Sequence, residues 1–493
     1  MKRFVSMVLI LTMILALGVT AYAADEAVLA AEPKFSITIN NAVENHTYEA
    51  YQIFAGKLHV NEEGSKILSD IQWGSGVTAD GQSALGNAAE KAEFLQEESD
   101  AADFAKEVVS YLDAENAILS TAAGNGTYTI ENLESGYYLI KDKDNSVQGH
   151  DAYTSYILQV VGDVNVKPKS SVPQVEKKIK DTNDSTDAVT DWQDSADYDI
   201  GDEVSFQLKA TLADNVSSYE NYKVVFHDTL SAGLTYQSIQ KITIDGTDVT
   251  DSFTVNDSEE NKLTISCNDV KVLGAGNHSV ITVEYTAKLN DKAVLGSAGN
   301  PNTVYLEFFN NPNWVGDGEN SPTGNTPEDK VIVFTYMVQI DKVNENDEPL
   351  EGAGFTLYKK YADESFNDGY RAVGEEKTGV TTFEWSGLDD GEYKLVETTT
   401  PDGYNTMYDI LFEIAAKHAE ESDNPTLIEL VGGDKFTGNI HTGVLNAKVV
   451  NKPGVKLPST GGMGTTVFYI VGGILVLTSG AVLLMNKRKN NNT

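Results

Sequence analysis

The stretch YMVQIDKV, at Tyr336–Val343, decides how this chain folds. Apolar and polar residues alternate in it, which is the pattern of a half-buried β-strand, since successive side chains point to opposite faces. Val338 and Ile340 occupy the inward face, and Lys342 has the same parity. Burial of an unpaired charge is costly, so an inward lysine predicts buried partners on neighbouring strands.

Two other strand-like stretches nearby also carry a polar residue on the apolar face. In EYKLVE, residues 392–397, Glu397 has the parity of Tyr393 and Leu395. In LNAKVVN, residues 445–451, Asn451 continues the apolar face. A lysine, a glutamate and an asparagine are therefore expected to point into one core.

The preceding region repeats this set. VEKKIK places Lys177 on an apolar face, KVVFHDTL places Asp228 there, and TVYLEFFNN places Asn310 there. In a dry core an ammonium tends to lose its proton and a carboxylate tends to gain one. A neutral lysine amine is a nucleophile. A neutral carboxylic acid can bond the amide carbonyl and shuttle protons as ammonia leaves. We expect one Lys–Asn amide per set, formed once per molecule and assisted by Asp228 or Glu397.

Similar alternating stretches divide the chain into three segments after its N-terminal leader. We expect an N-terminal domain at 24–170, a second domain at 171–332 and a third at 333–452, all mainly β. Apolar residues recur at helical spacing between Ser83 and Ala122, so the first domain should carry a helical insertion. The second and third read as β-sandwiches. LESGYYLIKD and LDDGEYKLVE align, which suggests that the first and third share one sandwich type.

Composition excludes several classes of protein. The formal net charge of −38 disfavours nucleic acid and anionic membrane surfaces as partners. The single cysteine, Cys267, excludes a disulfide within one chain and has the parity of a buried residue. There are 7 histidines, with no paired-histidine motif and no G-x-S-x-G, so we expect neither an enzyme nor a cofactor or metal. The stretch DTNDSTD, at 181–187, offers calcium ligands, but a solvated acidic loop is the preferred interpretation.

The two ends read as targeting segments. Residues 1–23 have a basic start, an apolar stretch and Ala-x-Ala, which predicts a signal peptide cleaved after Ala23. LPSTGG follows a linker within 453–466, and residues 467–485 form an apolar span just long enough to cross a bilayer. The basic tail, 486–493, should stay in the cytoplasm of the precursor.

LPSTGG, the apolar span and the basic tail together resemble the cell-wall sorting signal of Gram-positive surface proteins. The resemblance implies that a sortase recognises Leu457, Pro458, Ser459, Thr460 and Gly461, and cleaves between the last two. The whole chain resembles the major (backbone) pilins, with YKVVFHDTL typical of a Cna A-like isopeptide-forming domain and YKLVETTTPDGY typical of a Cna B-type domain. This implies tandem immunoglobulin-like sandwiches with Lys177–Asn310 and Lys342–Asn451 bonds. Asn302 and Asn311 remain alternatives to Asn310.

The resemblance also implies how subunits are joined. The family places an acceptor lysine at the end of the first domain, and Lys169 in VNVKPKSS matches it, with Lys167 as a competitor. Implied partners are a pilus-specific and a housekeeping sortase, other copies of this chain, minor pilins, peptidoglycan and host surface ligands. The alternatives are a singly wall-anchored adhesin and a minor tip or base pilin.

The first segment departs from the reactive pattern. Aligned on the third segment, Asp142 falls at the acid position, but Thr38 falls at the lysine position and Val166 at the asparagine position. We expect no isopeptide bond in this domain.

Overall fold

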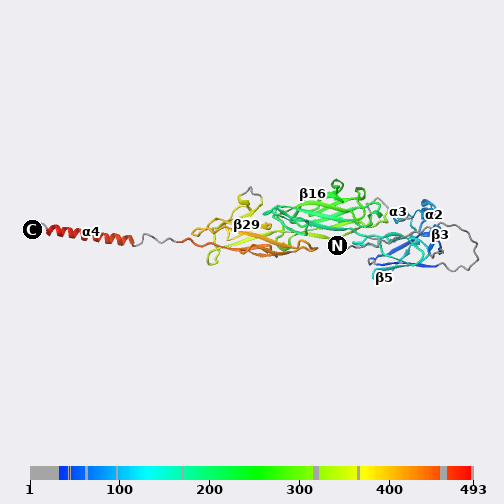
Figure 1. Cartoon of the computed structure of the whole chain (residues 1–493), viewed down its shortest axis with the longest axis horizontal. Helices are drawn as coiled ribbons and strands as arrows, with labels where there is room; N and C mark the ends of the chain where they lie inside the picture. The colour runs from blue at the N-terminus through cyan, green and yellow to red at the C-terminus, as the bar shows by residue number, and fades with distance from the viewer. Residues whose placement is uncertain are drawn as a thin grey trace, which may run out of the picture.

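The computed structural model describes residues 33–40, 42, 44, 46–60, 65–95, 98–168, 171–314, 321–362, 367–455 and 464–489. Within these ranges, three β-rich domains follow one another along the long axis, and helix α4 (Gly464–Lys489) extends beyond the third domain (Figure 1). The signal segment, Lys169 and the LPSTG motif fall outside the described residues.

The first domain is a sandwich with the expected helical insertion. One sheet has the order β5 (Thr121–Gly124), β6 (Thr127–Leu133), β1 (Phe35–Ile39), β9 (Val164–Val166). The other has the order β3 (Lys66–Trp73), β2 (Tyr48–Val60), β7 (Gly136–Asp142), β8 (Ser155–Val160), with β4 (Ile118–Leu119) beside β2. The helices are α1 (Ala79–Leu85), α2 (Ala88–Phe94) and α3 (Glu98–Val108). Thr78 and Asn87 cap α1 and α2 with side-chain oxygens, which satisfies free backbone N–H groups at each start.

The third domain repeats this arrangement without the helices. One sheet has the order β28 (Thr382–Leu388), β24 (Tyr336–Val343), β33 (Val444–Val450), β32 (Thr437–Asn439). The facing sheet has the order β26 (Tyr370–Ala372), β25 (Gly354–Lys360), β29 (Gly391–Thr399), β30 (Ile410–His418), β31 (Leu427–Val431), with β27 (Lys377–Thr378) beside β25. In both domains the first strand pairs in parallel with the last, as β1 with β9 and β24 with β33. This parallel pairing is what one sandwich type used twice predicts.

The second domain is a larger sandwich. Its first sheet has the order β10 (Gln174–Ile179), β14 (Glu203–Thr211), β20 (Val280–Leu289), β16 (Leu234–Ile244), β17 (Thr247–Asp248). Its second has the order β13 (Ser195–Asp197), β23 (Asp329–Phe334), β21 (Asn300–Phe309), β15 (Val224–Leu230), β19 (Lys262–Cys267), β18 (Thr254–Asn256), with β22 (Thr323–Asn325) beside β21. A small hairpin, β11 (Thr182–Asn183) and β12 (Ala188–Val189), projects toward the third domain.

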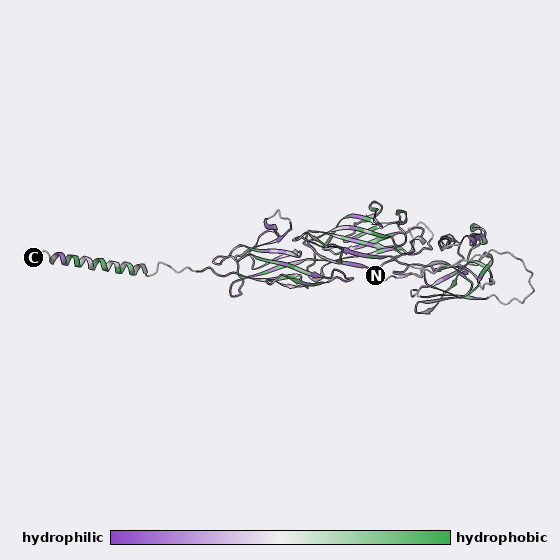
Figure 2. Cartoon of the chain, in the orientation of Figure 1, coloured by the Kyte–Doolittle hydropathy of each residue, from purple (hydrophilic) through white to green (hydrophobic). Residues whose placement is uncertain are grey.

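Burial follows the alternation read from the sequence. Strand β24 buries Tyr336, Val338, Ile340 and Lys342, and the residues between them are partly exposed. Cys267 is buried and unpaired. By contrast, α4 is mostly apolar up to Met485 and ends in basic residues, and its apolar stretch is not buried in the protein (Figure 2). Residues Val467–Lys487 are long and apolar enough to cross a membrane, as expected.

Candidate functional site

The third domain brings its lysine, glutamate and asparagine into one buried cluster. Lys342 lies on β24, Glu397 on β29 of the facing sheet, and Asn451 directly after β33. Asn451 Nδ2 donates a hydrogen bond to Glu397 Oε1 at 2.6 Å. The other oxygen, Glu397 Oε2, accepts from the backbone of Met407 at 2.9 Å, which fixes the carboxyl group. The three side chains are almost inaccessible to solvent.

The surroundings favour a neutral, nucleophilic Lys342. Burial lowers the pKa of Lys342, while the charge of Glu397 opposes this shift. Among the described groups, the amine nitrogen hydrogen-bonds to uncharged acceptors, the backbone oxygens of Val343 at 3.0 Å and Val449 at 3.4 Å. The side-chain oxygen of Asn451 is buried without a hydrogen-bond partner, a costly arrangement in a folded protein.

The second domain contains a corresponding cluster with four members. Lys177 on β10 and Asp228 on β15 form a short contact between the amine and Oδ2, and both are fully buried. The hydroxyl of Tyr285, on β20, lies 2.9 Å from Lys177 Nζ and 3.0 Å from Asp228 Oδ2. Asn302 on β21 donates from Nδ2 to the same hydroxyl at 2.7 Å. The backbone N–H of Lys177 donates to Asp329 Oδ2 at 2.6 Å, which holds the lysine in place.

Burial acts on this pair in opposite directions. It lowers the pKa of Lys177 and raises the pKa of Asp228, with the attraction between the two groups opposing both shifts. The environment therefore favours transfer of the lysine proton to the acid. Asp228 Oδ1 and Asn302 Oδ1 are both buried acceptors without a hydrogen-bond partner.

The geometry favours Asn302 over Asn310 as the asparagine of the second-domain cluster. Asn310 has the expected inward parity and is buried, but it lies beyond the end of β21. Its Nδ2 donates to the backbone oxygen of Asp151 in the first domain at 3.0 Å, and its own backbone oxygen accepts from Tyr153 at 2.7 Å. At roughly 3.3 Å per residue, eight residues of strand separate Asn310 from Asn302 by about 26 Å. Asn302 contacts the lysine cluster, and Asn310 belongs to the junction between two domains.

Asn311 does not reach the cluster either. Its side-chain oxygen accepts from the backbone of Asn313 at 2.9 Å, which closes the turn after β21. Of the two alternatives to Asn310, the geometry therefore favours Asn302.

The first domain holds its equivalent acid in a different way. Asp142 is fully buried, with Oδ1 2.8 Å from His46 Nδ1 and Oδ2 accepting from the backbone of Thr154 at 2.6 Å. The strand register places Ile37 opposite Val164, as Lys342 lies opposite Val449 in the third domain. The lysine position is therefore Ile37 rather than Thr38. Neither residue offers an amine.

A third buried lysine, Lys359, has the opposite electrostatics. Its amine lies 2.8 Å from Asp184, 2.6 Å from Asp199 and 3.3 Å from Asp389. Burial disfavours its charge, but the three carboxylates outweigh burial and raise the pKa of Lys359. This lysine is held as an ammonium and is not a nucleophile.

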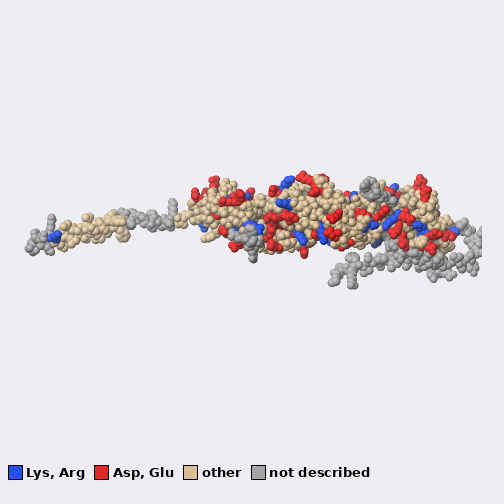
Figure 3. Space-filling model, turned by 90° about the horizontal axis from the view of Figure 1, so that it is seen from above, with Lys and Arg blue, Asp and Glu red and all other residues tan. Residues whose placement is uncertain are grey.

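Lys359 also shows that residues 181–187 are not simply a solvated acidic loop. Asp184 contacts Lys359, Asn183 Nδ2 donates to Asp390 at 2.6 Å, and Ser185 donates to the backbone oxygen of Lys360 at 2.9 Å. The hairpin is part of the contact between the second and third domains. Elsewhere, acidic side chains are spread along the exposed surface of the rod, in keeping with the net charge (Figure 3).

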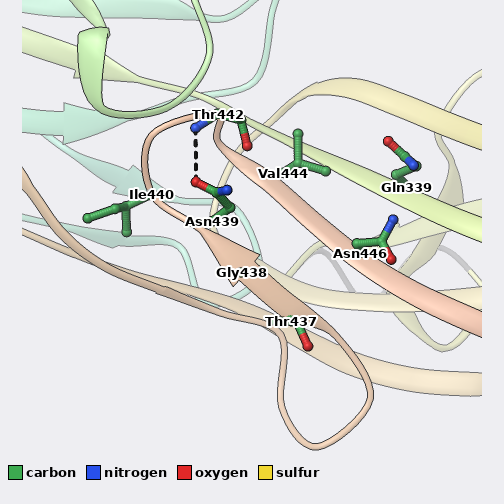
Figure 4. A pocket seen from close by; sticks show the side chains of 8 residues that line it. All are labelled: Gln339, Thr437, Gly438, Asn439, Ile440, Thr442, Val444 and Asn446. Atoms are coloured by element: carbon green, nitrogen blue, oxygen red, sulfur yellow. Dashed lines mark hydrogen bonds between the residues drawn. The ribbon is translucent and has the colours of Figure 1, made fainter.

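A shallow groove on the third domain lies away from this chemistry. Its lining is uncharged and includes Gln339, Asn439, Thr442 and Asn446, from β24, β32 and β33 (Figure 4). Gln339 alternates with the inward residues of β24, so the groove occupies the outer face of the sheet whose inner face carries Lys342.

Comparison with known proteins agrees with this architecture. Residues 336–424 match the SpaA family, described as a prealbumin-like fold domain, and residues 449–492 match the LPXTG cell wall anchor motif. The structure of the T6 backbone pilin of serotype M6 Streptococcus pyogenes is similar, with a TM-score of 0.55 and 18% identity, over 87% of this chain and 100% of that one. The chain therefore shares the fold of that backbone pilin and carries an LPXTG cell wall anchor motif.

The chain is also similar to a curated sequence relative, the trypsin-resistant surface T6 protein of Streptococcus pyogenes serotype M6. The two are 28% identical over 257 residues, which is 48% of this chain and 44% of the relative. The chain thus spans less than half the length of that relative. The LPXTG anchor motif and the apolar helix Val467–Lys487 identify a surface protein anchored to the cell wall of a Gram-positive bacterium.

Proposed function

We propose that this chain is a backbone pilin, the shaft subunit of a covalent pilus. A sortase cleaves between Thr460 and Gly461 and joins Thr460 of one subunit to Lys169 of the next. Head-to-tail bonds of this kind generate an open filament rather than a closed ring. The anchor motif at 449–492 and the backbone-pilin fold support this proposal.

Each subunit is stabilised by two internal amide bonds. Lys177 bonds to Asn302 with help from Asp228, and Lys342 bonds to Asn451 with help from Glu397. The observation that carries this proposal is the pair of buried clusters, each with a lysine of lowered pKa beside an acid and an amide. The side-chain oxygens of Asn302 and Asn451 are buried without partners, so each is free to accept a hydrogen bond from the neighbouring acid. The curated relative is named for trypsin resistance, a property that closed covalent loops would give this pilin.

The test of the shaft role is the acceptor lysine. In cells that express the pilin with its sortases, Lys169→Ala should abolish the ladder of high-mass species that survives boiling in detergent. The monomer should remain attached to the wall, because the anchor motif is unchanged. Lys167→Ala is the matched control, since Lys167 is exposed two residues away, and its ladder should be intact.

Two results would contradict this assignment. A ladder that survives Lys169→Ala and disappears in Lys167→Ala would move the junction to Lys167. A ladder unaffected by both changes, or absent from the unaltered protein, would leave a singly anchored surface protein.

A further inference from the structure

The hydroxyl of Tyr285 occupies the centre of the second-domain cluster. It accepts hydrogen bonds from Lys177 Nζ at 2.9 Å and from Asn302 Nδ2 at 2.7 Å, and donates to Asp228 Oδ2 at 3.0 Å. One oxygen thus contacts the attacking nitrogen, the leaving nitrogen and the acid. A group within hydrogen-bond distance of both nitrogens meets the geometric requirement for proton transfer between them.

The third domain does without such a hydroxyl. There the leaving nitrogen, Asn451 Nδ2, donates directly to Glu397 Oε1 at 2.6 Å. The second domain has an aspartate at this position, one methylene shorter than a glutamate. Asn302 Nδ2 bonds to the tyrosine hydroxyl, and the hydroxyl in turn bonds to Asp228. Tyr285 therefore fills the place that the longer acid side chain fills in the third domain.

The ring of Tyr285 is rigidly held. It is fully buried and stacks on Phe206 with ring centroids 5.3 Å apart and planes 18° from parallel. Lys177 Nζ lies 5.4 Å from the centre of the Phe206 ring and 5.2 Å from the centre of the Tyr285 ring. Burial raises the pKa of Tyr285, so the hydroxyl keeps a proton and can pass one on only as it receives another.

We propose that Tyr285 is a catalytic residue of the second domain, whose hydroxyl passes a proton from Lys177 Nζ to the departing nitrogen of Asn302. This inference rests on the proposed Lys177–Asn302 bond. It assigns different proton routes to the two domains, through a tyrosine in the second and directly through a glutamate in the third.

The reaction balances without any added reagent. Lys177 first gives one proton to Asp228, which leaves a neutral amine and a neutral acid. The Nζ–Cγ bond to Asn302 then forms and the Cγ–Nδ2 bond breaks. The phenolic oxygen takes a proton from Nζ while its own proton passes to Nδ2, which leaves as ammonia. Asp228 donates to the amide oxygen as negative charge develops there and keeps its proton at the end.

The test is the fraction of molecules that lose ammonia in each domain, measured by mass spectrometry of tryptic fragments soon after synthesis. In the unaltered ectodomain both domains should be fully crosslinked. In Tyr285→Phe the second-domain crosslink should form about 100-fold more slowly, as expected for loss of one acid–base group. The third domain of the same molecules is an internal control and should be complete. Tyr222→Phe is the matched control, because that buried hydroxyl has no hydrogen-bond partner in the described part of the domain.

A rescue variant separates catalysis from folding. Asp228→Glu combined with Tyr285→Phe should recover fast crosslinking, since the longer acid can bond the leaving nitrogen directly, as Glu397 does. A tyrosine with only a packing role would show no such rescue. The melting temperatures of Lys177→Ala and Lys177→Ala/Tyr285→Phe should be similar, because neither can crosslink in the second domain.

The outcomes distinguish failure of the Lys177–Asn302 bond from failure of the role of Tyr285. If the unaltered second domain loses no ammonia, the proposed Lys177–Asn302 bond is wrong, and the role of Tyr285 fails with it. If the unaltered domain crosslinks and Tyr285→Phe does so equally fast, the bond stands and the tyrosine role is overturned. A slow Tyr285→Phe without rescue by Asp228→Glu also overturns the proton route.

Discussion

Lys177, Lys342 and Lys359 are all fully buried, yet their surroundings give them different chemistry. Burial lowers the pKa of the first two, whereas three aspartates keep the third charged. A buried lysine is therefore not by itself a reactive one. The count of nearby carboxylates decides between a nucleophile and an ion-pair partner.

The choice between Asn302 and Asn310 predicts a difference in mass between two variants. The unaltered ectodomain should be lighter than its sequence by two ammonia molecules, about 34 Da. Asn302→Ala should lose only one, because the electrophile of the second domain is gone. Asn310→Ala should still lose both, since that side chain bonds to the first domain. Intact-mass measurement decides, and an Asn310→Ala protein that loses only one would reverse the assignment.

These residues also show how far the sequence can lead. Alternation identified the inward lysines, acids and asparagines, because parity is a property of the strand itself. It did not reveal how far along the sandwich each residue lies, so Asn302 and Asn310 were equivalent by parity. Tyr285 was missed for a related reason. It has inward parity in VITVEYTAKL, but a tyrosine there reads as an ordinary core residue, and only the fold shows what its hydroxyl contacts.

At the scale of elements, the two crosslinks would join different parts of the sandwich. Lys342 and Asn451 belong to the first and last strands of the third domain, which lie side by side in one sheet. Lys177 and Asn302 lie on β10 and β21, which belong to different sheets. Either bond closes a loop that includes most of its domain.

The third-domain bond should therefore dominate the stability of that domain. On the loop-entropy account, closing roughly a hundred residues contributes about 4–5 kcal/mol. Lys342→Ala should lower the melting temperature of the third domain clearly and expose it to trypsin. Lys448→Ala is a suitable control, because that lysine is exposed on the neighbouring strand. Equal trypsin resistance of Lys342→Ala and the unaltered protein would contradict the crosslink as the source of stability.

At the scale of the whole molecule, the joint between the second and third domains holds more acids than cations. Asp184, Asp199 and Asp389 surround Lys359. His418 lies 3.7 Å from Asp181 and 2.8 Å from the hydroxyl of Ser195. Other acids of the joint include Asp197, Asp202 and Asp390. Among the described residues, Lys359 and His418 face this group of acids and Lys178 pairs with Glu421 across the joint. Part of the negative charge of the group is therefore uncompensated when every acid ionises.

The raised pKa values of the buried acids determine how the stability of the joint changes with pH. Burial, with repulsion from Asp197, raises the pKa of Asp390 to about 7, and burial also raises that of Asp197. A raised carboxyl pKa means that the folded joint favours the protonated acid. This stabilisation is complete below the ordinary value of about 4 and is lost as the pH rises through about 7. Burial lowers the pKa of His418, but Asp181, Asp197 and Glu420 together outweigh burial and raise it, so the charge of His418 is lost in the same direction.

The rod should therefore be stiffer in mild acid than in mild alkali. Small-angle scattering from the ectodomain should give one extended shape at about pH 5 and a broader range of shapes at about pH 9, because ionised Asp197 and Asp390 repel across the joint. Asp390→Asn should reduce this difference, since the amide cannot ionise, whereas Asp251→Asn at an exposed position should not. Covalent bonds within domains leave this joint free to respond, so a pH effect on shape should occur without any change in crosslinking. Identical scattering at both pH values would contradict this prediction. It would show that Lys359 and its aspartates hold the joint whether Asp197 and Asp390 are protonated or ionised.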